Sequence, residues 1–276
     1  IWFSTWNGLN KFDGYTFKTY KTSQESKYAF GSNRMGTISE SKYGDIWCPT
    51  YDGQACLFDV ESEKFIDVLQ PIELSTKQTN NVTRIYSLEK GIAWILCENG
   101  YAFRVDEQLC KKGEGITLYA PSNHNLKGDQ IFNVYQDSEE DEWILTDKGV
   151  SIIGKKTLDT DFPFQFITQI KESIYLIAEN DKLARYDFHT KKLKFVDIPY
   201  PHDKINNVTT IGKDMLALGT DNGLILYSIP QNSFQQIDIR THLTAQFLFR
   251  DAAKRGISLV HADVLNIVQL AEYAQL

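Results

Sequence analysis

The sequence of 276 residues contains no apolar run of the length that a transmembrane helix requires, about 20 residues. It also has no excess of basic charge, because 29 Lys and Arg stand against 36 Asp and Glu, for a formal net charge of −7. A mildly acidic surface repels phosphate backbones, so we expect no nucleic acid contact by this domain. No signal peptide is visible, but the chain opens on Ile1-Trp2 inside a predicted strand, which suggests a fragment of a larger protein.

Cysteine is scarce, and its spacing excludes the usual metal motifs. The four cysteines, Cys48, Cys56, Cys97 and Cys110, form no CxxC pair, and the five histidines are scattered. We therefore expect no metal site and no cofactor. Cys48 and Cys56 flank a predicted tight turn at Asp52-Gly53, so either a disulfide crosses this hairpin or both are small buried apolar side chains.

The sequence is rich in aromatic residues, at 13%, and it repeats. Trp2 is followed six residues later by Gly8 and then by Phe12-Asp13. The same spacing of Trp to Gly recurs in three further copies, at Trp47 and Gly53, Trp94 and Gly100, and Trp143 and Gly149. Tyr175 and Leu216 stand at the Trp position of two weaker copies, and Gly223 follows the second of them. We interpret each Trp as a core residue and each Gly as a turn residue with positive φ.

The intervals between these positions are 45, 47, 49, 32 and 41 residues, close to the ~40–45 residues of one four-stranded propeller blade. Each copy is preceded by another strand pattern, and polar turns separate the strands. The sequence therefore predicts an all-β fold, a single β-propeller domain of four-stranded blades over residues 1–276. It predicts seven blades, with the innermost strand of the first blade missing because the chain begins at the second strand.

The last part of the chain, residues 243–276, has two interpretations. Ser258 falls 42 residues after Leu216, on the period, which favours a degenerate seventh blade. However, apolar residues at 260, 264, 267, 268 and 271 have helical spacing, so the last 30 residues or so can also form a helical tail.

The opening copy, Trp2-Phe3-Ser4-Thr5-Trp6-Asn7-Gly8-Leu9-Asn10-Lys11-Phe12-Asp13-Gly14, resembles the two-component regulator propeller repeat. That repeat builds the periplasmic sensor regions of hybrid two-component systems, which pair histidine kinase and response regulator modules. The resemblance implies a periplasmic location and a longer parent with a neighbouring propeller, a β-sandwich and a membrane helix. It further implies carbohydrate sensing and a homodimeric parent.

Topology predicts one binding face. In such a propeller, the turn after each Trp strand and the loop that leads into each innermost strand lie on the same side. The amides, carboxylates, cations and aromatic rings there suit sugar hydroxyls and ring faces, although the same residue types also form turns well. The candidate ligand-binding residues are Trp6, Asn7, Arg34, Tyr51, Asp52, Asn99, Asp147, Lys148, Asn180, Asp221 and Asn222. Trp6 and Tyr51 stand out, because an aromatic residue at a tight turn has no conformational reason to be there.

No nucleophile elbow, Walker loop, HExxH or Rossmann glycine pattern occurs, and acidic pairs such as Glu139-Glu140 fall in predicted turns. We therefore predict no catalytic residues and a sensor domain that detects an oligosaccharide or monosaccharide and signals through domain or dimer packing. A protein-interaction scaffold is the alternative. A propeller glycoside hydrolase or lyase, which needs a convergent pair of carboxylates, is a third hypothesis.

Overall fold

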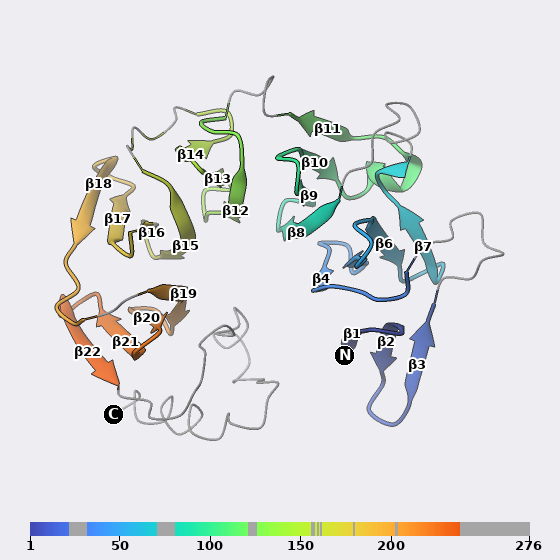
Figure 1. Ribbon diagram of the computed structural model, residues 1–276, viewed down its shortest axis with the longest axis horizontal. Coiled ribbons are helices and arrows are strands. Elements are labelled where there is room, and N and C mark those ends of the chain that lie inside the picture. The colour runs from blue at the N-terminus through green and yellow to red at the C-terminus, as the bar shows by residue number, and fades with distance from the viewer. Residues whose placement is uncertain are drawn as a thin grey trace. The chain divides into compact units, whose positions relative to one another are not determined.

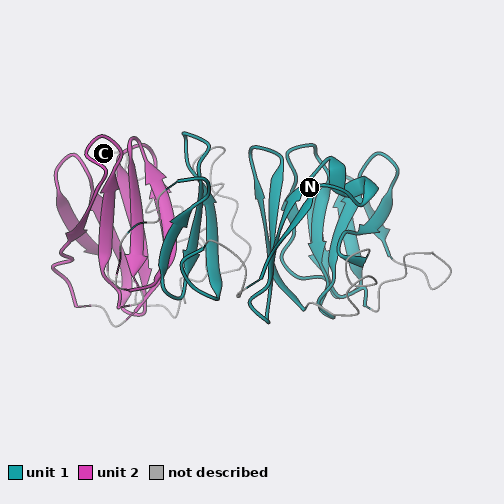
Figure 2. Ribbon diagram, turned by 90° about the horizontal axis from the view of Figure 1, so that it is seen from above, with its two compact units in different colours: residues 1–159 teal, residues 160–276 magenta. Residues whose placement is uncertain are grey.

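The computed structural model describes residues 1–21, 32–70, 81–120, 126–155, 158, 160, 162–178, 180–201 and 204–237. These residues form antiparallel strands and one short 3-10 helix, η1 (Leu109–Lys112), as Figure 1 shows. The predicted seventh blade or helical tail, residues 243–276, lies outside the described residues. The chain divides into two compact units, Ile1–Asp159 and Thr160–Leu276 (Figure 2).

The described residues of unit 1 form four sheets, which we call blades 1 to 4. Blade 1 consists of β1 (Trp2–Thr5), β2 (Gly8–Phe12) and β3 (Phe17–Tyr20). Blade 2 consists of β4 (Ser39–Glu40), β5 (Ile46–Pro49), β6 (Ala55–Asp59) and β7 (Lys64–Asp67). Blade 3 consists of β8 (Val82–Leu88), β9 (Ile92–Cys97), β10 (Ala102–Asp106) and β11 (Ile116–Tyr119). Blade 4 consists of β12 (Ile131–Gln136), β13 (Glu142–Thr146) and β14 (Gly149–Ile152).

Unit 2 contains two four-stranded sheets among its described residues. Blade 5 consists of β15 (Phe164–Ile170), β16 (Ser173–Ala178), β17 (Leu183–Asp187) and β18 (Lys192–Val196). Blade 6 consists of β19 (Ile205–Ile211), β20 (Met215–Thr220), β21 (Gly223–Ser228) and β22 (Ser233–Ile237). Each sheet is an antiparallel meander in chain order, which is the blade of a β-propeller, so the predicted fold class is confirmed.

The repeat positions fall where the sequence predicts them. The Trp strand is the second strand of blades 2 to 4, and Tyr175 and Leu216 occupy the second strands of blades 5 and 6. In blade 1 no strand of the described residues pairs with the free edge of β1, the side on which the sequence predicts a missing innermost strand. Blade 4 differs from the four-stranded expectation, because its described residues hold three strands and only an isolated bridge from Val150 to Leu158. This difference agrees with the short interval of 32 residues that follows Trp143.

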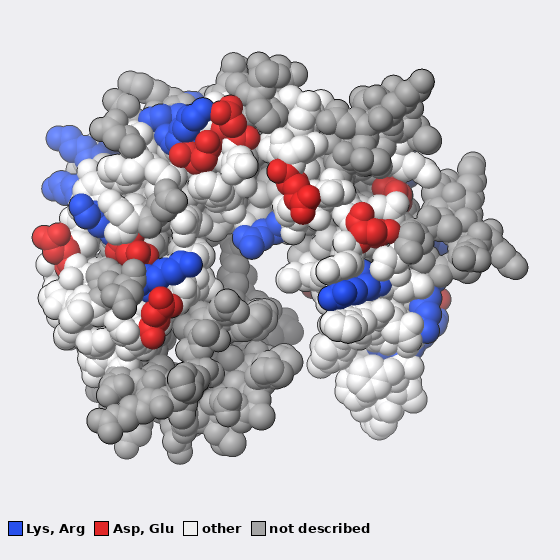
Figure 3. Space-filling view, viewed as in Figure 1, with Lys and Arg blue, Asp and Glu red and all other residues white. Residues whose placement is uncertain are grey.

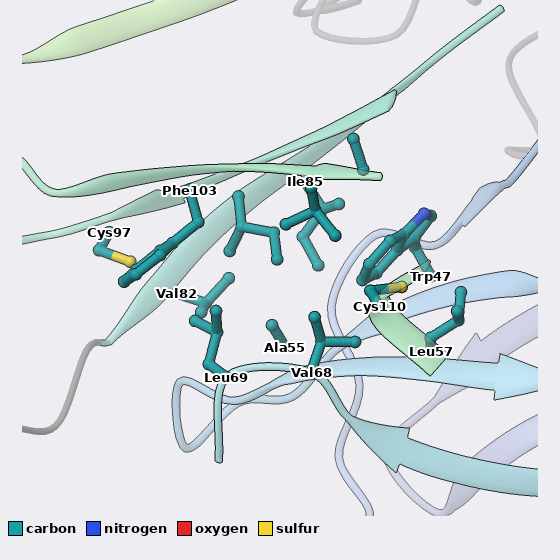
Figure 4. Close-up of a cluster of buried hydrophobic side chains, with 13 residues drawn as sticks. Trp47, Ala55, Leu57, Val68, Leu69, Val82, Ile85, Cys97, Phe103 and Cys110 are labelled. Atoms are coloured by element: carbon teal, nitrogen blue, oxygen red, sulfur yellow. The ribbon is translucent and has the colours of Figure 1, made fainter. Parts of the chain in front are cut away.

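Apolar residues of neighbouring sheets form the core. Trp47 and Trp94 are completely buried, and Trp143 is nearly so. Figure 4 shows the cluster between blades 2 and 3, in which Trp47 lies with Val68, Ile85 and Phe103. Each sheet thus buries a face against its neighbour, which a single blade cannot do alone.

Buried carboxylates satisfy the indole N–H of these tryptophans. Trp47 Nε1 donates to Glu107 Oε1 at 2.8 Å, and Trp94 Nε1 donates to Glu142 Oε2 at 2.8 Å. In both pairs the carboxylate belongs to the following blade, so the hydrogen bond links two sheets. Trp143 instead uses Asp137 of its own blade, at 2.7 Å. A buried N–H without a partner would destabilise the fold, so these carboxylates have a structural role.

Turn chemistry also follows the prediction. The repeat glycines Gly8, Gly53, Gly100, Gly149 and Gly223 all have positive φ. The Asp that closes the third strand accepts backbone N–H bonds: Asp13 Oδ1 from Thr16 at 2.7 Å, Asp59 Oδ1 from Ser62 at 2.8 Å and Asp187 Oδ1 from Thr190 at 2.8 Å. These bonds are the main reason why the pKa of each of the three carboxyls lies below its usual value.

Cys48 and Cys56 are direct cross-strand neighbours in β5 and β6, as the sequence predicts, but both are free thiols. Both are completely buried, and burial raises the pKa of each thiol far above its usual value. Of the two interpretations, the structure therefore favours small buried apolar side chains over a disulfide.

Candidate functional site

One end of the strands in unit 1 carries all the predicted site residues of that unit, and backbone hydrogen bonds hold it together. Gly8 N–H donates to Asn33 O at 2.9 Å, and Tyr51 N–H donates to Arg34 O at 2.8 Å. Further along, Glu98 N–H donates to Asn81 O at 2.9 Å, and Asp147 N–H donates to Gln130 O at 3.0 Å. The turns after the second strands and the lead-in loops therefore lie side by side, and we call this surface the turn face of unit 1.

Trp6, Arg34 and Tyr51 meet on the turn face. The guanidinium carbon of Arg34 lies 4.2 Å from the centre of the Trp6 ring and 3.7 Å from that of Tyr51. The cation is therefore placed over two aromatic rings, each of which attracts it. Trp6 remains 77% exposed and Tyr51 69% exposed, so much of each ring is open to solvent. We call these three residues the aromatic-arginine cluster.

Asn7 and Asp52, the neighbours of the two aromatic residues in their turns, are also exposed. Thr5 Oγ1 accepts the backbone N–H of Asn7 at 3.1 Å, which fixes the first turn. The amide of Asn7 and the carboxylate of Asp52 thus lie in the same turns as the aromatic-arginine cluster, as polar groups available to a ligand.

Other predicted residues of unit 1 stabilise the turns themselves. Asp147 Oδ1 accepts the backbone N–H groups of Asp129 at 2.7 Å and Gln130 at 3.0 Å. Lys148 Nζ lies 2.5 Å from Asp129 Oδ2. Asn99 Oδ1 accepts the N–H of Tyr101 at 3.1 Å. Structural hydrogen bonds account for these positions, so they do not by themselves indicate a ligand site.

In unit 2 the predicted residues lie at the corresponding turns. Asn206 Nδ2 donates to Asp221 Oδ1 at 2.6 Å, which links a lead-in loop to the turn of the same blade. The N–H of Asn222 donates to Thr220 Oγ1 at 3.2 Å. Asn180 is exposed in the turn after β16. Asp221 therefore resembles Asp147 in stabilising a turn.

A shallow groove opens between blades 3 and 4 on the turn face. The sequence prediction missed Tyr101, which lines the groove directly after the turn glycine Gly100. The sequence signal for Tyr101 is an aromatic residue directly after the repeat glycine, where two other copies have Leu9 and Leu224. The groove is lined by Thr83, Leu96, Cys97, Glu98, Gly100, Tyr101, Gln130, Ile131 and Phe132.

The charge on the described surface is mixed. Figure 3 shows basic and acidic side chains interspersed on the face it draws. Among the residues that the structure describes, no group of three or more His, Cys, Asp or Glu side chains has the geometry to hold a metal ion. The chemistry available on the turn face is therefore that of aromatic rings, amides and single charges.

Comparison with solved structures places this chain among β-propellers. An extracellular domain assigned to a hybrid two-component system, BT4673 from B. thetaiotaomicron, is 20% identical with a TM-score of 0.62. A second, BT3049 from the same organism, is 14% identical with a TM-score of 0.52. The match covers 88% of this chain in both cases, but only 35% and 39% of those chains. At these identities the two structures show the propeller fold that the opening repeat indicates.

The same fold also supports other activities. Virginiamycin B lyase from Staphylococcus aureus is 16% identical with a TM-score of 0.57, over 86% of this chain and 78% of the lyase. No family model matches the sequence, and no curated protein matches it. No helix among the described residues is long and apolar enough to cross a membrane. At these identities the comparisons show the fold, and this chain spans little more than a third of the sensor domains it matches.

Proposed function

We propose that this chain is a non-catalytic, extracytoplasmic sensor domain of a transmembrane two-component regulator and that it binds a saccharide on its turn face. The aromatic-arginine cluster is the observation that carries the proposal. The two rings at tight turns remain largely exposed beside Arg34, and aromatic rings with polar groups beside them suit the apolar and hydroxyl faces of a sugar. The similarity to extracellular sensor domains supports this role.

Ligand binding would be signalled by a change in the packing of domains or subunits. A ligand that binds one arrangement of domains or subunits better than another shifts the population toward it. The partners in this mechanism are the neighbouring propeller and β-sandwich of the parent chain and a second copy of the parent in a homodimer. A periplasmic location puts the turn face on the side of the membrane where nutrients arrive.

Calorimetric titration of the chain with a panel of oligosaccharides and monosaccharides tests the proposal. At least one saccharide should bind, with heat that saturates at a defined stoichiometry. Failure of every saccharide to bind would leave the chain as a scaffold. A product formed from any panel member during the titration would instead support the lyase or hydrolase alternative.

Exposed apolar side chains on blade 1 favour the alternative role, that of a scaffold. Ile1, Phe3, Tyr15 and Phe17 of blade 1 are exposed, and Phe17 stacks on Phe12 with 4.7 Å between ring centres. Exposed apolar side chains in one sheet are typical of protein contacts. A scaffold predicts that a protein partner, and no saccharide, protects these residues.

A further inference from the structure

The guanidinium of Arg34 has no carboxylate partner among the described residues. Two hydrogen bonds fix the backbone of Arg34, since its N–H donates to Ser32 Oγ at 3.1 Å and its carbonyl accepts from Tyr51 at 2.8 Å. Its guanidinium carbon lies over the Trp6 and Tyr51 rings. By contrast, Arg104 in the same unit pairs with Glu142 at 2.6 Å, and Lys148 pairs with Asp129 at 2.5 Å. Among the described residues, Arg34 is thus a cation on the turn face without a carboxylate partner, and an anionic ligand can pair with it.

From this geometry we infer that the aromatic-arginine cluster binds the carboxylate of an acidic sugar, a uronate. The inference rests on the proposed saccharide-binding function and names the class of saccharide. The guanidinium carbon of Arg34 lies over the rings of Trp6 and Tyr51, which attract its charge but accept no N–H in its plane, so the N–H donors remain for a ligand. A planar fork of N–H donors matches the two oxygens of a carboxylate, and binds them with two parallel hydrogen bonds.

The surroundings favour a sugar carboxylate over a polyanion or an inorganic anion. The exposed ring surfaces of Trp6 and Tyr51 offer apolar area, which the C–H face of a sugar ring can cover and a phosphate ion cannot. Asn7 and Asp52 add an amide and a carboxylate for hydroxyl groups. The net charge of −7 opposes a densely charged polymer, whereas one carboxylate per sugar ring meets little repulsion.

A matched set of ligands tests this inference on the full 276-residue chain. The set contains a uronate oligosaccharide, its neutral methyl ester, an oligosaccharide that carries sulfate but no carboxylate, and a peptide rich in Glu. We expect the uronate to bind by calorimetry and the methyl ester to bind about tenfold or more weakly, because a charge-assisted hydrogen bond is lost.

Variants locate the site. Arg34→Met keeps the length of the side chain and should weaken uronate binding about tenfold or more, to the level of the methyl ester. Arg34→Lys keeps the charge but loses the planar fork, so its affinity for the uronate should lie between that of the wild type and that of Arg34→Met. Arg84→Met is the control, because Arg84 is an exposed arginine that also lies over a tyrosine, with 5.9 Å to the Tyr86 ring. Equal thermal unfolding of all variants shows that the fold is kept.

The outcomes separate the inference from the proposed function. Binding of the uronate and its ester with equal affinity, unchanged in Arg34→Met, would overturn the inference and leave saccharide sensing in place. Preference for the sulfated sugar would overturn the choice of carboxylate. Binding of the Glu-rich peptide alone would overturn both and support the scaffold, and no binding of any sugar would also overturn both.

Discussion

At the scale of single residues, Glu142 links two blades through a buried charge. Its side chain is only 6% exposed, accepts from Trp94 Nε1 at 2.8 Å and pairs with Arg104 at 2.6 Å. The same hydrogen bonds raise the pKa of Arg104. Removal of one partner of a buried pair leaves an uncompensated charge, which is more costly than the pair is stabilising.

Glu142→Gln should therefore lower the free energy of unfolding by about 2–3 kcal/mol, although the amide oxygen can still accept from Trp94. Urea unfolding followed by tryptophan fluorescence measures this change. The exposed Glu114 provides the control, since Glu114→Gln should change the free energy by less than about 0.5 kcal/mol. Equal unfolding midpoints for the two variants would contradict the structural role of Glu142.

The carboxyl group of Asp59 makes the free energy of unfolding depend on pH in the acid range. The N–H of Ser62 and then the ammonium of Lys111 lower the pKa of Asp59 from 3.8 to about 2. Because the folded pKa lies below the unfolded value, this contribution is complete above about pH 4 and is lost as the pH falls through about 2. It amounts to about 1–2 kcal/mol after allowance for solvent screening.

The variant Asp59→Asn separates this group from Asp13 and Asp187, whose pKa values are also lowered. We expect the wild type to lose about 1–2 kcal/mol more than the variant between neutral pH and about pH 2.5. Urea unfolding at both pH values gives the loss in the free energy of unfolding for each protein, and the difference between the two losses is the contribution of Asp59. A parallel loss in the two proteins would show that Asp59 does not contribute.

At the scale of elements, the first hairpin depends on Gly8. Its φ is +111°, and a Cβ atom there would lie 2.3 Å from the carbonyl oxygen of Tyr20 in β3. Gly14, in the next turn, has a similar φ of +107° but no atom within 4 Å of that Cβ position. Alanine variants of these two glycines therefore distinguish the cost of steric overlap from the cost of a positive φ.

Gly14→Ala should lower the free energy of unfolding by about 1–2 kcal/mol, and Gly8→Ala by about 3 kcal/mol or more. Thermal unfolding followed by circular dichroism measures both. Equal losses would mean that β2 and β3 can separate enough to accept the methyl group, contrary to the packing of blade 1.

Local sequence was sufficient to predict the hairpins, because each turn depends on residues close together in the chain. The positive φ of Gly8 and the N–H bonds to Asp13 are examples. The partners of Trp47 and Trp94 were not predictable in this way, since Glu107 lies 60 residues from Trp47 and Glu142 lies 48 residues from Trp94. Similarly, topology predicted that Trp6, Arg34 and Tyr51 share a side, but the stacking of Arg34 depends on loop conformations that no residue spacing reveals.

At the scale of the whole molecule, the turn faces and the outer strands have different roles. Short turns joined by backbone hydrogen bonds present polar and aromatic groups at one end of each unit's strands. The last strands of the blades, such as β3 and β7, lie at the outer edge of their sheets and carry exposed charged residues such as Lys18 and Lys64. A ligand bound on the turn face should therefore affect the turns and leave the outer strands unchanged.

Amide hydrogen exchange with and without a bound saccharide tests whether the ligand lies on the turn face. We expect slower exchange at residues 4–8, 32–36 and 50–54 when the saccharide is bound, and unchanged exchange in β3 and β7. Slower exchange confined to the outer strands, or no change at the turns at saturating saccharide, would contradict a binding site on the turn face.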